Sequence, residues 1–199
     1  NDNFAAATPV PQTLTVNKAA GTVVLGSLAQ TYTGTARTAT ATTTPPGLTV
    51  DFTYDGGATA PINVGTYAVV GTLNSQNYAG SASGNLVIGK ADQVITFAGT
   101  ELASKTFGDA PFTVAATADS TLTVSFTSSD PTVATVSGNT ITILTGGTTT
   151  ITATQAGNGN YNAAPPVAQT LTIAKKAVTV ALTDLTHTYN GSPKGACGT

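Results

Sequence analysis

The chain has 199 residues and few charges, with 7 Lys and Arg against 9 Asp and Glu and a formal net charge of −2. No basic cluster is larger than Lys175-Lys176, which excludes the basic stripe that nucleic-acid-binding proteins use to neutralise phosphates. No apolar run approaches the roughly 18–20 residues that a membrane-spanning helix needs. A single cysteine, Cys197, excludes an intrachain disulfide framework.

The composition predicts many short β-strands. Threonine occurs 42 times, glycine 21 times and proline 10 times. Thr and Val suit a pleated, half-buried surface, and Gly and Pro interrupt such a surface with turns. Nowhere do apolar residues recur at helical spacing over a helix-sized window. We therefore expect an all-β protein.

The sequence repeats itself along its length. Residues 1–42 align without a gap to residues 158–199, at an offset of 157, and 21 of the 42 positions are identical. Many other changes are mild, such as Phe4 for Tyr161 and Val16 for Ile173. Self-similarity at a fixed period is the signature of a tandem array, so we expect the chain to hold a little more than one period of such an array.

A weaker repeat divides this period into modules. Three segments each contain an Asn-aromatic pair, then small residues, then a strand ending in Lys; these strands are LTVNK (14–18), LVIGK (86–90) and LTIAK (171–175). We expect a module to end at each Lys. The predicted organisation is the closing strand of one module (1–18), two complete modules (19–90 and 91–175) and the opening of another (176–199). Without Gly/Ser-rich linkers between them, the joints should be semi-stiff.

Module 19–90 carries three segments that resemble the MBG-type repeats of bacterial adhesins. They are QTYTGTAR (30–37), PPGLTVDFTYDG (45–56) and GTYAVVGTLNSQNYAGSASGNLVIGK (65–90), and the first recurs as HTYNGSPK (187–194). The resemblance implies a mostly-β module of an extracellular repeat protein, and a second such module opening at 176–199.

Module 91–175 contains closely spaced strand patterns. Ser137-Gly138-Asn139 predicts a hairpin turn because Gly and Asn tolerate positive φ, and Gly146-Gly147 predicts the next turn. Short strands at this spacing indicate a two-sheet sandwich. The predicted strands are VITF (94–97), FTVAAT (112–117), LTVSFTSS (122–129), ATVS (134–137), TITIL (140–144), TTTITATQ (148–155) and VAQTLTIA (167–174).

Residues 126–161, FTSSDPTVATVSGNTITILTGGTTTITATQAGNGNY, resemble the bacterial immunoglobulin-like domains of surface adhesins and invasin-type proteins. The resemblance implies an Ig-like β-sandwich over 91–175, with residues 1–18 closing a preceding Ig-like module, and a role as a spacer. The fold class we expect is thus all-β, with tandem small β domains that alternate between the two types.

The apolar positions of the predicted strands give the expected cores. In the second module these are Val94, Ile95, Phe97, Val114, Val124, Phe126, Val133, Val136, Ile141, Ile143, Ile151, Leu171 and Ile173. In the first they are Val23, Leu25, Leu28, Val50, Phe52, Tyr54, Tyr67, Val69, Leu73, Leu86 and Ile88.

The two residues most suited to catalysis vary between repeat copies. His187 stands where the earlier copy has Gln30, and Cys197 stands where it has Thr40. A nucleophilic cysteine needs a base and an electropositive setting, and the base here would be a repeat-variable histidine. We interpret both as strand or surface residues, with an intermolecular disulfide as the alternative role of Cys197.

The acidic residues form no D-x-D-x-D calcium loop. Asp109 in FGDAP and Asp130 in SSDP are typical of turns, in which the carboxylate bonds its own backbone. Calcium at the module junctions, near Asp92 and Asp184, is the alternative. The other acidic residues are Asp2, Asp51, Asp55, Glu101 and Asp119.

The recurring lysines and aromatics suggest two further chemistries. A Lys–Asn cross-link needs a buried Lys, but Lys18, Lys90 and Lys175 end their modules. A sugar platform could use the recurring aromatics, which are Phe4, Tyr78 and Tyr161 in one set and Tyr32 and Tyr189 in the other. We expect core packing instead, because Phe replaces Tyr in one copy and a ring hydroxyl is therefore dispensable.

These patterns favour a structural spacer or stalk module of a bacterial extracellular repeat protein, either an adhesin or a surface filament. We expect no enzyme and no catalytic, cofactor-binding or metal site. The alternative is a glycan- or cell-binding adhesive module, with Tyr54 and Tyr67 as residues to test. Expected partners are neighbouring repeats, including head-to-tail assembly by strand addition at the chain ends; otherwise those ends simply belong to neighbouring modules of a longer protein.

Overall fold

The computed structural model describes residues 3, 5–183, 186–195 and 197–198. In this part the chain is all-β, as expected, and its one helical element is a single 3₁₀ turn at Thr100–Leu102. A helix long and apolar enough to cross a membrane does not occur among these residues. The chain divides into two compact units, residues 1–91 with 159–161 and residues 92–158 with 162–199.

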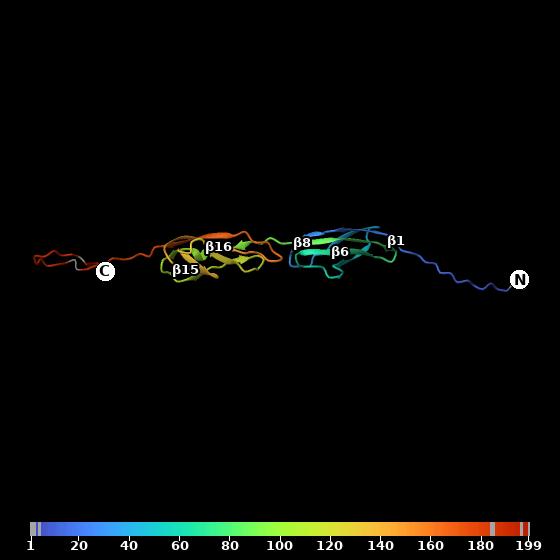
Figure 1. Cartoon of the computed structure of the whole chain (residues 1–199), viewed down its shortest axis with the longest axis horizontal. Coiled ribbons are helices and arrows are strands. Elements are labelled where there is room, and N and C mark those ends of the chain that lie inside the picture. The colour runs from blue at the N-terminus through green and yellow to red at the C-terminus, as the bar shows by residue number, and fades with distance from the viewer. Residues whose placement is uncertain (1–2, 4, 184–185, 196, 199) are drawn as a thin grey trace. The chain divides into compact units, whose positions relative to one another are not determined.

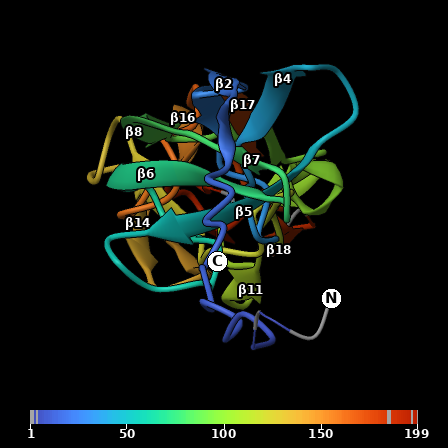
Figure 2. The same ribbon diagram turned by 90° about the vertical axis from the view of Figure 1, so that its right-hand side faces the viewer.

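The first unit is built on a four-stranded sheet in the order β3-β8-β6-β5, in which β3 runs parallel to β8 and the other pairs are antiparallel (Figures 1 and 2). Two smaller pairs complete the unit, β2 with β4 antiparallel and β1 with β7 parallel. The strands are β1 (Ala19–Ala20), β2 (Thr22–Gly26), β3 (Ala29–Thr31), β4 (Thr40–Thr44), β5 (Thr49–Tyr54), β6 (Gly65–Asn74), β7 (Tyr78–Ala79) and β8 (Ser81–Gly89).

Alternation along β6 and β8 places the core of this unit. Val69 on β6 and Leu86 and Ile88 on β8 are buried, while their neighbours along each strand face outward. Tyr54 and Ala39 join the same cluster, with the Tyr54 hydroxyl accepting the Ala39 N–H at 3.0 Å. The hydroxyl therefore satisfies a buried backbone donor, which would otherwise cost stability.

One close approach in this unit requires glycine. A Cβ on Gly80 would lie 2.1 Å from the carbonyl oxygen of Gly21, and real Cβ atoms are not found so close to backbone. Gly21 donates its N–H to Ala79, and Gly80 accepts the N–H of Leu73. Glycine at this point thus lets β1, β6 and β7 meet.

The second unit has a four-stranded sheet in the order β10-β17-β16-β13, a three-stranded sheet in the order β11-β15-β14, and a β9–β12 pair. Its strands are β9 (Ile95–Thr96), β10 (Lys105–Thr106), β11 (Phe112–Thr113), β12 (Thr117–Ala118), β13 (Ser125–Ser128), β14 (Ala134–Ser137), β15 (Thr140–Ile143), β16 (Gly147–Thr154), β17 (Val167–Ala174), β18 (Leu182–Thr183) and β19 (Cys197–Gly198). Gly138 and Asn139 form the predicted hairpin turn between β14 and β15, with Gly138 at φ +62°.

The core of the second unit is a single cluster to which all three sheets contribute. Ile151 on β16 and Leu171 on β17 are fully buried, as is Ile141 on β15, and Ile95 on β9 packs with them. The Thr residues between these apolar positions, such as Thr172, face outward. The alternation gives β17 one buried face and one exposed Thr-bearing face, whereas on β16 Thr149 shares the buried face with Ile151.

The two units share one sheet topology. In each, two long strands form an antiparallel pair, β6–β8 or β16–β17, and the second of them closes its module. An earlier strand, β5 or β13, adds antiparallel beside β6 or β16, and a short strand, β3 or β10, adds parallel beside β8 or β17. The closing strand of each module is therefore paired along both edges.

The repeat is also visible in strand register. Leu25 pairs with Ala41 and Gly26 with Thr40 in the β2–β4 pair. In β18–β19, Leu182 pairs with Gly198 and Thr183 with Cys197. Every partner is offset by 157 residues, so the two copies adopt the same pairing.

Three sequence predictions need correction. Val94, predicted as core, is 61% exposed because its alternate neighbours Gln93 and Ile95 point inward. The predicted strand 112–117 is two short strands, β11 and β12, which pair with different partners. The strand β10 was not predicted, since a two-residue strand has no detectable period.

The repeat offers a matched pair of stability variants. Leu171 is fully buried, whereas its counterpart Leu14 is 86% exposed. We expect Leu171→Ala to lower the free energy of unfolding by about 2–5 kcal/mol through lost burial and a cavity. Leu14→Ala should change it by no more than about 0.5 kcal/mol. Urea unfolding followed by circular dichroism measures both, and equal effects would contradict the burial assigned to β17.

Candidate functional site

The histidine and cysteine singled out from the sequence are not brought together with catalytic partners. His187 is exposed. Its counterpart Gln30 has a structural role, because its Nε2 donates to the carbonyl oxygens of Ser27 at 2.7 Å and Thr38 at 2.8 Å. The backbone of Cys197 lies in β19 at the register position that Thr40 holds in β4. The counterparts of both residues in the first unit, Gln30 in β3 and Thr40 in β4, are thus strand residues.

Three aspartates stabilise turns in their own neighbourhood. Asp55 accepts the N–H of Ala68 at 2.8 Å, and Asp109 accepts the N–H of Thr106 at 2.8 Å. Asp130 accepts both the N–H of Thr132 at 2.9 Å and its hydroxyl at 2.6 Å. The turn roles predicted for Asp109 and Asp130 are confirmed.

The hydrogen bond from the Thr132 hydroxyl, together with the Thr132 N–H, holds the pKa of Asp130 below its ordinary value. Hydrogen bonds to the ionised form favour that form. Because the folded-state pKa lies below the unfolded one, this contribution to stability is present above the unfolded pKa and is lost as the pH falls through the folded pKa.

The remaining aspartates also bind protein groups. Asp119 accepts the N–H of Val94, Asp51 accepts from the Asn74 side chain, and Asp92 accepts from Asn162 Nδ2 at 2.8 Å. Among the residues that the structure describes, no three His, Cys, Asp or Glu side chains gather as a metal-binding group. Asp2 and Asp184, named above, lie outside the described residues.

The three module-ending lysines are exposed. Lys18 Nζ donates to the carbonyl oxygen of Ser75 at 2.6 Å, which fixes the entrance to the first unit. A Lys–Asn cross-link requires a Lys buried beside its Asn. The exposure of Lys18, Lys90 and Lys175 does not meet that requirement.

The recurring Asn-Tyr pair has the same structural role in both modules. The N–H of Ala19, which follows Lys18, is bound by the carbonyl oxygen of Asn77, and Ala19 pairs in parallel with Tyr78. The N–H of Ala91, which follows Lys90, is bound by the carbonyl oxygen of Asn160, and Ala91 pairs in parallel with Tyr161. The motif therefore holds the first residue of its own module.

The aromatic rings pack as structural groups. Tyr161 lies edge to face against Tyr32, with ring centroids 5.3 Å apart, inside the first unit. Tyr54 is buried, and the Tyr67 hydroxyl donates to the Asn63 carbonyl oxygen. Tyr189 is exposed, and Phe4 lies outside the described residues.

Sequence reasoning missed a buried polar network around Gln93, whose side chain is 1% exposed. Its Nε2 donates to Gln155 Oε1 at 2.7 Å and to the Asn162 carbonyl oxygen at 2.6 Å, and its Oε1 accepts the Ser120 hydroxyl. The only sequence signal was the alternation Gln93-Val94-Ile95, which placed Gln on the same face as Ile. The network ties Gln155 and Asn162 to Gln93, near the start of the second unit.

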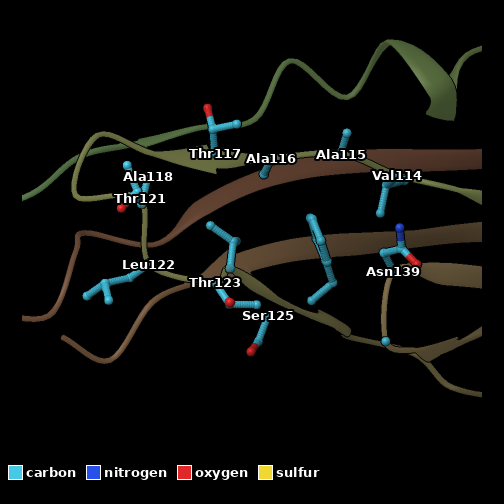
Figure 3. Close-up of a pocket in the computed structure, with 13 residues that line it drawn as sticks. Val114, Ala115, Ala116, Thr117, Ala118, Thr121, Leu122, Thr123, Ser125 and Asn139 are labelled. Atoms are coloured by element: carbon cyan, nitrogen blue, oxygen red, sulfur yellow. The ribbon is translucent and has the colours of Figure 1, made fainter. Parts of the chain in front are cut away.

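The second unit also carries an open groove of about 1050 Å³ (Figure 3). One wall is the segment 114–118, which follows β11 and includes β12, and the facing wall is the segment 121–126, which enters β13. Gly138 and Asn139 of the β14–β15 turn border it. All of its lining residues are uncharged, so the groove suits an uncharged occupant.

The Asp130 turn gives a pH-dependent prediction. Thr132→Val removes the hydroxyl but keeps the backbone N–H, so the pKa of Asp130 should rise toward its ordinary value. Carboxyl-carbon NMR titration measures the change directly. Thr135→Val, at an exposed position of β14, is the control and should leave the Asp130 pKa unchanged. An unchanged pKa in both variants would disprove the role of Thr132.

The Gln93 network gives a stability prediction. Gln93→Ala leaves the buried Ser120 hydroxyl and Gln155 side chain without this partner and should cost about 1–3 kcal/mol of unfolding free energy. Gln12→Ala, in the exposed segment 5–17, is the control and should stay within about 0.5 kcal/mol. Hydrogen exchange at residues 155–162 should accelerate only in the Gln93 variant.

Comparison with known proteins is informative for the first module. Residues 21–92 match the family model of the MBG domain. No curated protein matches the chain. The matched span begins two residues after Ala19, whose N–H is bound by the first Asn-Tyr pair. It ends at Asp92, one residue after Ala91, whose N–H is bound by the second pair. The first module of this chain is therefore similar in sequence to the MBG domain.

Proposed function

We propose that the chain is a non-catalytic spacer segment in the stalk of a bacterial extracellular repeat protein. The observation that carries the proposal is the repeated entrance geometry, in which Ala19 and Ala91 are each bound by the Asn-Tyr pair of their own module. A protein that propagates by identical joints gains reach with each repeat and needs no unique site.

The residues that differ between copies support the same proposal. His187 replaces Gln30 and Cys197 replaces Thr40, while the strand register is unchanged. Selection for catalysis would hold the reactive groups and let their scaffold vary. In this chain the strand pairing is the same in both copies, whereas His187 and Cys197 occur in one copy alone.

We further propose that residues 91–175 form an Ig-like module and that the two module types alternate along the full protein. The shared strand order of the β3-β8-β6-β5 and β10-β17-β16-β13 sheets supports this, since it gives both modules one architecture. The sequence period of 157 residues supports alternation.

An extracellular, cell-surface location belongs to the same proposal. Its support is the Thr-rich outer face of strands such as β16 and β17, combined with the low charge of the whole chain. A neutral hydroxyl surface changes little with salt or pH, because it has few groups to screen or titrate.

Small-angle X-ray scattering on chains of one, two and three periods tests the spacer role. The radius of gyration should grow almost in proportion to the number of periods, whereas a globule grows with roughly the 0.38 power of chain length. Growth at the globular rate would refute the proposal.

A glycan array on the same samples tests the adhesive alternative. Micromolar binding that is lost in Tyr67→Ala would replace the spacer role. Tyr54→Ala is a poor probe of that alternative, since Tyr54 is a buried core residue and its loss would act through stability.

A further inference from the structure

We propose that the first module bears tensile load, because the strand through which the chain enters it is bonded in parallel to the segment through which the chain leaves. The proposal rests on the stalk function, in which each module is pulled at its two ends, and it adds a mechanical function to that role. Every contact that carries it lies inside the first unit.

The entering strand β1 is bonded to the start of the closing segment. It pairs in parallel with β7. Ala19 donates its N–H to the Asn77 carbonyl oxygen at 2.8 Å, and Gly21 donates its N–H to the Ala79 carbonyl oxygen at 2.9 Å. Since Gly80 alone separates β7 from β8, these bonds join the entrance directly to the strand that closes the module.

A second parallel contact joins the same two parts of the chain at the exit. Here β3 pairs with the end of β8. Val87 donates its N–H to the Leu28 carbonyl oxygen at 2.7 Å, and Tyr32 donates its N–H to the Gly89 carbonyl oxygen at 2.9 Å. An extended chain from Tyr78 to Gly89 spans roughly 35 Å. The entering and closing parts of the chain are therefore bonded at both ends of the module.

Parallel pairing decides how these bonds are loaded. A pull on Lys18 draws β1 toward its own start, and a pull on Lys90 draws β8 toward its own end, so the paired segments are drawn in opposite directions along one axis. The hydrogen bonds between them run across that axis. All bonds of one contact are therefore strained together and break together, whereas strands pulled apart from one end lose their bonds one at a time.

The contact between β1 and β7 is the first to be loaded. From the entrance, the shortest bonded path to the exit crosses from Ala19 to Asn77 and then follows the backbone to Gly89. Lys18 reinforces this crossing, because its Nζ donates to the Ser75 carbonyl oxygen at 2.6 Å. Strands β2 to β6 lie outside this path, so they are pulled apart only after β1 detaches.

The second module repeats both parallel contacts. Ala91 pairs in parallel with Tyr161, and the Ala91 N–H is bound by the Asn160 carbonyl oxygen at 3.0 Å. At its exit, β10 pairs in parallel with the end of β17, and Phe107 donates its N–H to the Ala174 carbonyl oxygen at 2.9 Å. Two modules of different sequence thus join their entering and closing strands in the same way.

Force spectroscopy on the full chain, in a Cys197→Ser background, tests the direction of load. Handles coupled to Asn17→Cys and Lys90→Cys pull along the strands, whereas handles on Thr66→Cys and Val87→Cys pull a cross-strand pair of β6 and β8 apart. All four side chains are exposed. Forced unfolding follows the unfolding rate, and bonds that break together present a higher barrier. The first geometry should therefore need a several-fold higher force at the same loading rate.

Two proline variants test the entrance contact itself. Ala19→Pro removes the N–H that binds Asn77. The N–H of Ala20 points away from β7 by alternation and binds no other described residue, so Ala20→Pro is the matched control. Both alanines are exposed. Pulled along the strands, Ala19→Pro should unfold at a lower force than the parent chain, and Ala20→Pro at the same force as the parent.

The second pulling direction separates loss of the contact from general destabilisation. Pulled across β6 and β8, Ala19→Pro and Ala20→Pro should unfold at the same force, because β1 carries no load in that direction. Equal parent forces in the two directions would overturn the proposal. So would an Ala19→Pro force that is unchanged along the strands, or one that falls equally in both directions. Globular growth of the scattering radius would refute the spacer role and leave these forces unchanged, so the two proposals fail separately.

Discussion

The rest of each unit depends on the strand that closes its module, which is hydrogen-bonded along both edges. β8 lies between β6 and β3, and β17 lies between β16 and β10. The inward side chains Leu86, Ile88, Leu171 and Ile173 are buried to 3% exposure or less. The strand that ends each module is thus a central strand of its sheet, and a module gains most of its core only when its final residues are in place. Each module consequently ends at a strand that is paired along both edges, and the next module starts within a few residues.

The Asn-Tyr pair binds the first residue of each module. It lies just before the last strand, and its Asn carbonyl oxygen binds the N–H of the residue that opened the module. Entrance and closure of a module are therefore neighbours in space although they are far apart in sequence. The Tyr ring is retained for packing, as the contact of Tyr161 with Tyr32 illustrates, and the recurrence of aromatics does not require a ligand.

Sequence alone predicted the elements that have a period. Alternation located β13 to β17, the hairpin turn at Gly138, and most core residues, because side chains of period two face one interior. It could not predict β10, whose two residues pair in parallel with β17. It also could not predict that Val94 is exposed, because a strand this short does not show which of its residues face inward. The Gln93 network was missed for a different reason: a buried amide is identified by its partners, and Ser120, Gln155 and Asn162 are distant in sequence. The groove was not predicted either, because its border is formed by the β14–β15 turn and no local sequence pattern shows how far that hairpin extends.

The repeat places one strand sequence in two environments, and the difference has a physical consequence. Residues 10–17 and 167–174 share the positions Val, Gln, Thr, Leu and Thr, yet one segment is buried in a sheet and the other is exposed. Burying a Leu or Val side chain contributes about 1.5–3 kcal/mol, so this strand stabilises a module only where the rest of that module surrounds it. A tandem array that closes every module with the same kind of strand must keep each strand in its own module, and the pairing of β8 and β17 along both edges does this.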